Sequence, residues 1–141
     1  MKLEKIDFDY QFQIVENWLF NRDYVITQFT GAEDSVCYNT REVLINTRKH
    51  VESRFYTLLH ECGHILINDN RDRLYKLSRE TQAYWGKKPA RSRRIAVLSE
   101  EVEAWKRGER LAKKLGLKIN ERKFDTARTN ALMSYVEWAR D

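Results

Sequence analysis

Hydrophobic and polar positions follow two different periods along the chain. Near the N-terminus, apolar side chains recur at every third or fourth position, which predicts an amphipathic helix over residues 9–21. The apolar positions of this first segment are Phe8, Phe12, Val15, Trp18 and Leu19. Together they form one side of the helix, and we expect that side to pack on a core.

Three short segments rich in β-branched and aromatic residues come next. They are DYVITQF at residues 23–29, SVCYN at 35–39 and EVLIN at 42–46. TGAED and NTRE separate them and have the Gly, Asn and Asp content of turns. Short strands joined by short turns predict a small antiparallel sheet of three strands.

Helical spacing returns in the rest of the chain. It predicts helices over about 50–68, 95–115 and 121–139, with Gly116 ending the second of these. Residues 72–84 are ambiguous and are a candidate for one more helix. The order of elements predicts an α+β fold: an N-terminal helix, a small antiparallel three-stranded sheet, a long central helix, and two to three further helices.

Length and composition are those of a single globular unit. With 141 residues, of which 42% are hydrophobic and 33% charged, we expect one domain over residues 1–141. No apolar run approaches the roughly 20 residues of a membrane span, and the N-terminal MKLEKIDFDYQF lacks the apolar core of a signal peptide. Cys37 and Cys62 then indicate a reducing compartment rather than a disulfide framework. We expect a cytoplasmic protein that does not associate with membranes.

The excess of basic residues is unevenly distributed. The formal net charge is +5, and KKPARSRR at residues 87–94 holds five basic residues in eight. Such a run is usually a solvated loop or helix flank, and we favour that interpretation. A docking site for nucleic acid or for an acidic partner is the alternative. No aromatic residue interleaves the run, so support for nucleic-acid binding is weak.

The strongest candidate chemistry lies in YTLLHECGHILIN, residues 56–68, inside the predicted central helix. His60 and His64 are four residues apart, so both imidazoles project from one face and can reach the same ion. Glu61 lies at the edge of that face, within reach of a water bound to the ion. This is the H-E-x-x-H arrangement, in which two imidazoles hold Zn²⁺ and the carboxylate acts as general base.

A chance placement of these residues on a core helix is the competing interpretation. We consider it much weaker, because burying unpaired polar groups costs several kcal/mol and the flanks of the motif are apolar. Gly63 supports a special environment, since glycine costs about 1 kcal/mol relative to alanine in a helix interior. Its absent side chain suits a helix that packs closely beneath a strand.

A zinc site with two histidines needs at least one more protein ligand. His50 is a poor candidate, because ten residues of helix separate it from His60 by about 15 Å. Cys37 stays open as an alternative. The richest source of ligands is SEEVEAWKRGERLA, which carries Glu100, Glu101 and Glu103.

Helical spacing helps to choose among these three acids. Glu101 falls within the apolar stripe of its predicted helix, whereas Glu100 lies at one border and Glu103 points mostly away. An acid on an apolar stripe requires a partner, and a cation is the obvious one. We therefore predict Glu101 as the third ligand, with Glu103 and Glu100 as alternatives. Acids in a first helical turn also favour the helix dipole, by up to about 1 kcal/mol, without any metal.

Three pieces of the chain carry a resemblance to a known family. They are VLINTR before the motif helix, FYTLLHECGHIL within it, and EEVEAWKRGERLAKKLG in the later acidic helix. In these pieces the chain resembles the ImmA/IrrE group of small zinc metallopeptidases, which occur in phages and mobile elements. The similarity extends over about residues 35–115.

The resemblance implies a gluzincin-type site, with His60 and His64 as zinc ligands and Glu61 as general base. It also implies a third ligand from the cluster at 100–103. Aligning the group's Glu-Ala pair favours Glu103, whereas aligning its later aromatic residue with Trp105 favours Glu101. Members of the group are associated with the cleavage of DNA-binding repressors, so the implied substrate is a protein of that kind.

Two functions follow as hypotheses. The first is a zinc-dependent metalloendopeptidase, in which EVLIN pairs with an extended substrate peptide. Tyr135 is a candidate donor to the oxyanion, although a place in the core is the favoured interpretation of this residue. The second is a non-catalytic metal-binding regulatory protein that binds DNA or a repressor through its basic loop. A metal hydrolase that does not act on peptides is a third and weaker idea.

Overall fold

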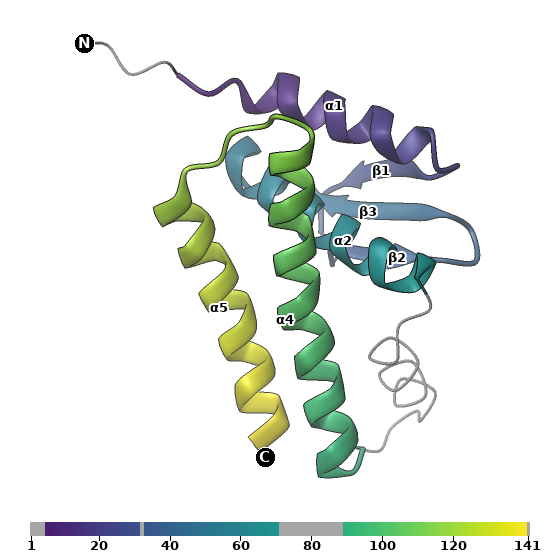
Figure 1. The fold of residues 1–141 in the computed structure, drawn as a ribbon, viewed down its shortest axis with the longest axis vertical. Coiled ribbons are helices and arrows are strands. Elements are labelled where there is room, and N and C mark those ends of the chain that lie inside the picture. Colours follow the sequence, from purple (N-terminus) through teal and green to yellow (C-terminus); the bar gives the residue numbers. More distant parts are fainter. Residues whose placement is uncertain (1–4, 32, 71–88, 141) are drawn as a thin grey trace.

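The computed structural model describes residues 5–31, 33–70 and 89–140. Its elements lie in the order α1 (Phe8–Phe20), β1 (Val25–Phe29), β2 (Ser35–Cys37), β3 (Glu42–Asn46), α2 (Val51–Asp69), α4 (Arg91–Lys114) and α5 (Glu121–Arg140) (Figure 1). The α+β order predicted from the sequence is confirmed. The ambiguous segment 72–84 lies outside the described residues.

The sheet is mixed, so the prediction of an antiparallel sheet is wrong for one of its two pairings. The strand order is β1-β3-β2, with β3 parallel to β1 and antiparallel to β2. The chain passes from β1 to the far edge before it returns through the centre. The central strand is the most buried one, since Val43 and Ile45 of β3 are fully buried, whereas all three residues of β2 are half-buried.

The core lies between the sheet and the helices. Val43 and Ile45 alternate along β3 and join a cluster with side chains from α1, α2, α4 and α5. The helix α2 contacts every one of these helices as well as β2 and β3. Because α2 is the central element of the packing, its position is fixed from several sides. None of the helices in the described part of the chain is both long and apolar enough to cross a bilayer.

Helices α2 and α4 cross in close backbone contact at two glycines. A Cβ atom added to Gly63 of α2 would overlap with the backbone carbonyl of Ala104 in α4. A Cβ atom added to Gly108 of α4 would likewise overlap with the backbone carbonyl of Leu59. The close neighbour of Gly63 is therefore a helix and not the strand that we expected, since the sheet packs on another side of α2. This crossing fixes how near the side chains of α4 come to those of α2.

Helix α4 begins at Arg91, four residues before the predicted start, and so includes half of the basic run. Arg94 is buried rather than solvated, whereas residues 87 and 88 of the run lie outside the described residues. The predicted end at Gly116 is confirmed. Gly116 has a φ of 71°, and the backbone N–H groups of Gly116 and Leu117 donate to the carbonyls of Lys113 and Ala112. This pair of bonds is the Schellman motif.

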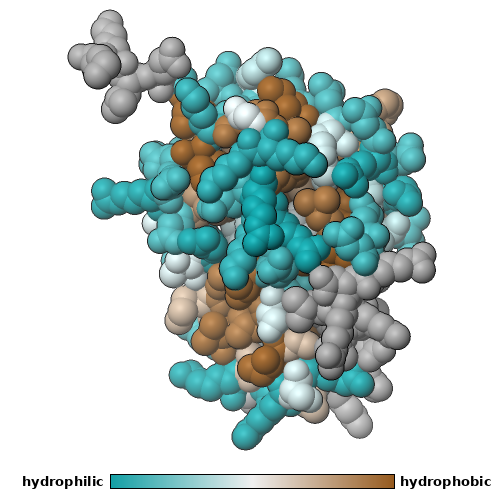
Figure 2. Space-filling view, viewed as in Figure 1, coloured by the Kyte–Doolittle hydropathy of each residue, from teal (hydrophilic) through white to brown (hydrophobic). Residues whose placement is uncertain are grey.

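Helix α5 is attached to the core mainly at its start. The backbone N–H of Asn120 donates to the Tyr56 hydroxyl at 2.8 Å, and Phe124 is buried against the rings of Tyr56 and Trp105. Beyond Phe124, no residue of α5 is fully buried. Figure 2 shows hydrophobic surface over the lower parts of α4 and α5 in this view. The exposed large hydrophobic residues of these two helices are Ile95, Met133 and Val136.

Candidate metal centre

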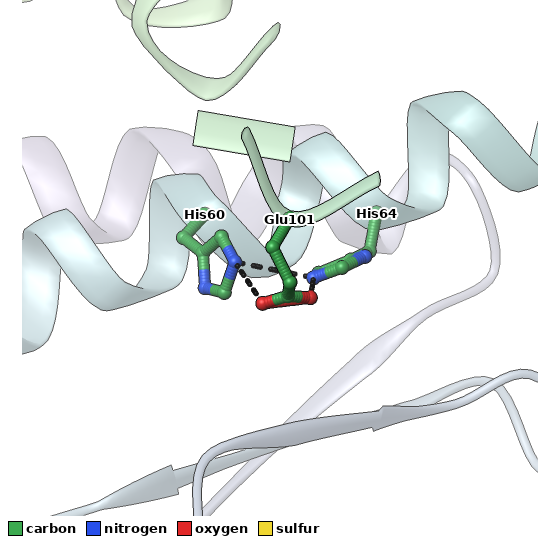
Figure 3. A group of neighbouring side chains, drawn as sticks. All are labelled: His60, His64 and Glu101. Atoms are coloured by element: carbon green, nitrogen blue, oxygen red, sulfur yellow. Dashed lines mark hydrogen bonds and ion pairs between the residues drawn. The ribbon is translucent and has the colours of Figure 1, made fainter. Parts of the chain in front are cut away.

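The structure brings His60, His64 and Glu101 together where α2 and α4 cross. Figure 3 shows both imidazoles projecting from α2, with the Glu101 carboxylate between them. The His60 Nε2 atom lies 3.1 Å from Glu101 Oε1, and the His64 Nε2 atom lies 2.7 Å from Oε2. The two Nε2 atoms are 3.1 Å apart. Three donor atoms from two helices thus point at one position.

This arrangement fits a divalent metal ion. In a tetrahedral zinc site with bonds of about 2.0–2.1 Å, neighbouring ligand atoms are about 3.3 Å apart. One candidate atom from each of His60, His64 and Glu101 lies within 4.8 Å of the others, and the shortest separations are near the tetrahedral value. Two imidazoles and a carboxylate are also a usual donor set for catalytic zinc. The residues present could therefore hold the ion with little rearrangement.

The outer nitrogens of both imidazoles also face carboxylates. His60 Nδ1 lies 3.4 Å from Glu61 Oε1, and His64 Nδ1 lies 3.7 Å from Glu100 Oε2. Partners of this kind orient a ligating imidazole and increase its basicity. The ring of His60 also stacks on Trp105, with centroids 4.5 Å apart and planes 13° apart. The rings are thus held in place by α4.

Charge inside the cluster keeps its groups ionised. Burial disfavours the imidazolium form of His60, but hydrogen bonds to Glu101 and Glu61 outweigh it and raise the pKa of His60 to about 9. The pKa of His64 is raised for a similar reason, since burial is outweighed by its hydrogen bond to Glu101. Burial alone would raise the pKa of Glu101, yet the two histidines lower it well below its usual range. Each charged group of the cluster therefore stabilises the opposite charge beside it.

The other ligand candidates lie elsewhere. Glu103 pairs with Arg107 at 3.0 Å and with Arg110 at 3.8 Å. His50 is exposed at the N-cap of α2. Cys37 is half-buried on β2. Among the described residues, the group able to hold a metal consists of His60, His64 and Glu101. Glu103, His50 and Cys37 are not part of it.

Comparison with known proteins gives this geometry a family context. Residues 22–101 match the family model of the IrrE N-terminal-like domain, a peptidase family. The chain belongs to this family. Comparisons with curated proteins and with solved structures found no match.

The match to the IrrE N-terminal-like domain runs from the end of α1 to Glu101 in α4. It therefore includes His60, Glu61 and His64, and its last residue is Glu101. Most of α4 and the whole of α5 follow the matched region. The family accordingly supports a metallopeptidase, and the candidate metal ligands His60, His64 and Glu101 all lie within the matched part of the chain.

A cavity of about 720 Å³ opens over the cluster of this IrrE-like domain. Its floor includes His60, Glu61 and His64. One wall comes from β2, the loop before it and the segment after β3, and α4 and α5 form the opposite side. Glu61 therefore shares the space in front of the candidate metal position. Most strand residues that border the cavity belong to β2, one edge of which has no partner among the described strands. The expectation that EVLIN pairs with a substrate is wrong, because this strand, β3, is paired on both sides.

Sequence reasoning missed two neighbours of the imidazoles. Glu100 was predicted only as an alternative ligand, yet its carboxylate faces the outer nitrogen of His64. Trp105 was considered only as the aromatic residue that aligns with the ImmA/IrrE group, yet it stacks on His60. The signal was available in part, because Glu101 and Trp105 are four residues apart and lie on one face of α4. The angle at which α4 crosses α2 was not available from the sequence.

Proposed function

We propose that this protein is a zinc-dependent metalloendopeptidase that hydrolyses peptide bonds of a protein substrate. The observation that carries the proposal is the convergence of His60 Nε2, His64 Nε2 and the Glu101 carboxylate at one point in a cavity that Glu61 also lines. Family membership supports a metallopeptidase. Zinc as the ion and the roles of the individual residues are part of the proposal.

In this proposal His60, His64 and Glu101 hold the zinc ion. A bound zinc ion supplies Lewis acidity and brings the pKa of water down towards about 7. Glu61 accepts a proton from the attacking water and passes it to the leaving amine, which is general acid–base catalysis by one carboxylate. Glu100 orients His64 through its outer nitrogen. The described cluster offers three ligands, which favours a catalytic site over a structural site closed by four protein ligands.

The substrate peptide binds in extended form along the open edge of β2. Ser35 and Val36 of this strand line the cavity, and an unpaired strand edge can accept a further strand through backbone hydrogen bonds. Lys49 and Asp34, joined by an ion pair of 3.0 Å, lie on the same rim. The resemblance to the ImmA/IrrE group makes a DNA-binding repressor the first substrate to test.

The test compares zinc-loaded parent protein with Glu61→Gln on a proteome-derived peptide library and on candidate repressors, with products read by mass spectrometry. We expect Glu61→Gln to bind zinc at the parent stoichiometry and to cleave about 10²–10⁴ times more slowly, the usual contribution of a general base. Glu103→Gln is the matched control, because it makes the same chemical change at a residue outside the cavity. It should cleave at the parent rate.

Two results would count against the proposal. A Glu61→Gln variant that cleaves as fast as the parent would remove Glu61 from the chemistry. A zinc-loaded parent that cleaves nothing but binds a repressor or DNA would support the alternative, a non-catalytic metal-binding regulator. A variant lacking Arg91 and Arg93 would then show whether the basic segment carries that binding.

A further inference from the structure

Tyr135 lies over the candidate metal centre although it comes from outside the family-matched region. It belongs to the second half of α5 and lines the cavity together with His60, Glu61 and Glu101. Its side chain is half-buried, and burial together with the nearby charges of Glu101 and Glu61 raises the pKa of its hydroxyl. The expectation of a core tyrosine therefore does not describe this residue.

Tyr56 shows what a core tyrosine in this protein looks like. Its side chain is 1% exposed, and its hydroxyl donates to Glu52 at 2.7 Å while accepting from the backbone N–H of Asn120. The hydroxyl of Tyr56 thus uses both its donor and its acceptor in hydrogen bonds that stabilise the fold. The ring of Tyr135, in contrast, has an edge contact with Trp138, and its hydroxyl faces a carboxylate at the floor of the cavity.

The fold holds Tyr135 in this position through α5. Phe124 anchors the start of the helix in the core, between Tyr56 and Trp105. About three helical turns separate Phe124 from Tyr135, so both side chains project from the same side of α5. Ala131, one turn before Tyr135, lines the cavity as well. The side of α5 that packs in the core at Phe124 therefore lines the cavity further along the helix, at Ala131 and Tyr135.

The chemistry proposed for this cavity requires a donor that neither zinc ligands nor Glu61 supply. During peptide hydrolysis, negative charge develops on the carbonyl oxygen of the scissile bond, and a preorganised hydrogen-bond donor stabilises it. Several other donors on the cavity wall are committed. Ser134 donates to the Ala131 carbonyl, and Lys49 pairs with Asp34. The indole N–H of Trp105 has no hydrogen-bond partner among the described residues, but its nitrogen is buried from solvent.

We propose that Tyr135 is a catalytic residue of this site, whose hydroxyl donates a hydrogen bond to the carbonyl oxygen of the scissile peptide bond. This inference rests on the proposed peptidase function. When Glu101 serves as a metal ligand, the hydroxyl proton of Tyr135 is free to turn to a substrate oxygen in the same cavity. Tyr135 keeps its proton throughout, and Glu61 alone carries the proton that passes from water to the leaving nitrogen.

The test is Tyr135→Phe, which keeps the ring and its packing on Trp138 and removes only the hydroxyl. Removing one donor of this kind typically lowers kcat by about 10²–10³-fold. We expect that loss with a nearly unchanged KM, because the hydrogen bond strengthens only as charge develops. Tyr10→Phe is the matched control, since Tyr10 is 61% exposed on α1 and should keep the parent kcat.

A second readout does not depend on turnover. The zinc-loaded parent and Tyr135→Phe are titrated with a phosphinic pseudopeptide, whose charged oxygens imitate the transition state, and with zinc alone. We expect Tyr135→Phe to bind the pseudopeptide about 10²–10³ times more weakly, with an unchanged zinc affinity and an unchanged melting temperature.

The possible outcomes distinguish failure of the role of Tyr135 from failure of the proposed peptidase function. If the parent cleaves peptides and Tyr135→Phe keeps both kcat and pseudopeptide affinity, the role of Tyr135 is refuted and the peptidase stands. If Tyr135→Phe loses zinc affinity in proportion to activity, Tyr135 only positions Glu101, and the proposal is again overturned. If the parent itself cleaves nothing, the proposed function fails, whatever the variant does.

Discussion

The two faces of α2 are almost equally buried, but one carries apolar side chains and the other carries ionisable ones. Phe55, Leu58 and Cys62 on one face are fully buried. On the other face, the side chains of His60 and Glu61 are 11% and 7% exposed. Burial stabilises the first face, by about 1.5–3 kcal/mol for each large apolar side chain. The same burial costs several kcal/mol for each polar group that has no partner.

The difference shows that the polar face depends on groups supplied by another helix. Glu101 and Glu100 of α4 provide the carboxylates that face His60 and His64. The apolar face needs only to be covered, whereas the polar face needs partners at defined distances. Any change that shifts α4 against α2 should therefore affect the polar face more specifically than the apolar one.

Gly63→Ala should produce the largest effect, because it forces the two helices apart. The added Cβ atom would overlap with the backbone of Ala104, which cannot move away as a side chain can. We expect the free energy of unfolding to fall by about 3–5 kcal/mol. We also expect weaker zinc binding, since Glu101 moves with α4. Chemical denaturation and a zinc titration measure the two quantities.

Gly116→Ala is the control for this substitution. Gly116 has a positive φ of 71°, with nothing within 4 Å of the added atom, so alanine costs only the strain of the left-handed conformation, about 1–2 kcal/mol. Zinc affinity should stay at the parent value. Equal losses of stability and of zinc affinity in both variants would show that the helix crossing has no special role.

Competition between protons and zinc should produce an intermediate effect. The pKa of His60 is raised from 6.5 to about 9 in the metal-free fold. Protonated His60 therefore stabilises the metal-free protein fully below about pH 6.5 and loses this contribution as the pH rises through about 9. Zinc must displace that proton, so its affinity should rise by up to about tenfold per pH unit over this interval.

Two measurements check this prediction. Titration against a chelator of known affinity at several pH values gives the zinc affinity, and thermal unfolding of the metal-free protein gives its stability. The melting temperature of the metal-free protein should fall between pH 7 and pH 9, while that of the zinc-loaded protein should change less. A zinc affinity independent of pH would mean that His60 carries no proton in the metal-free protein.

Glu103→Gln should produce the smallest effect and locate the edge of the polar site. Glu103 pairs with Arg107 and Arg110 near the surface, and ion pairs of this kind contribute about 0.2–1 kcal/mol. We expect a loss of stability within that range and an unchanged zinc affinity. Glu101→Gln, measured beside it, should lose zinc. A loss of zinc in Glu103→Gln instead would exchange the roles of the two acids.

The helices were predictable from the sequence because their apolar spacing is regular. All the predicted helices that fall on described residues are present, and the end of α4 at Gly116 follows from local backbone chemistry alone. The sheet was only partly predictable. Three strands could be located by their composition, but their order depends on which strand the helices bury, and that is a property of the whole fold.

The candidate site divides in the same way. His60, Glu61 and His64 are close in sequence, so one helix fixes their relation and the motif is sufficient to identify them. Glu101 could be ranked above its neighbours by periodicity, yet its contact with both imidazoles depends on the crossing at Gly63 and Gly108. The position of Tyr135 depends on α5, whose direction is set by packing around Phe124 rather than by any local signal.

The shortness of β2 has a consequence for how a peptidase of this shape would choose its targets. A strand of three residues can form only a few backbone hydrogen bonds with a substrate peptide. Binding of the peptide along the edge of β2 is therefore weak. Substrate specificity would then depend on contacts made away from the scissile bond. Such a protease would cleave most unfolded polypeptides slowly and would act on the few proteins that also bind elsewhere on its surface.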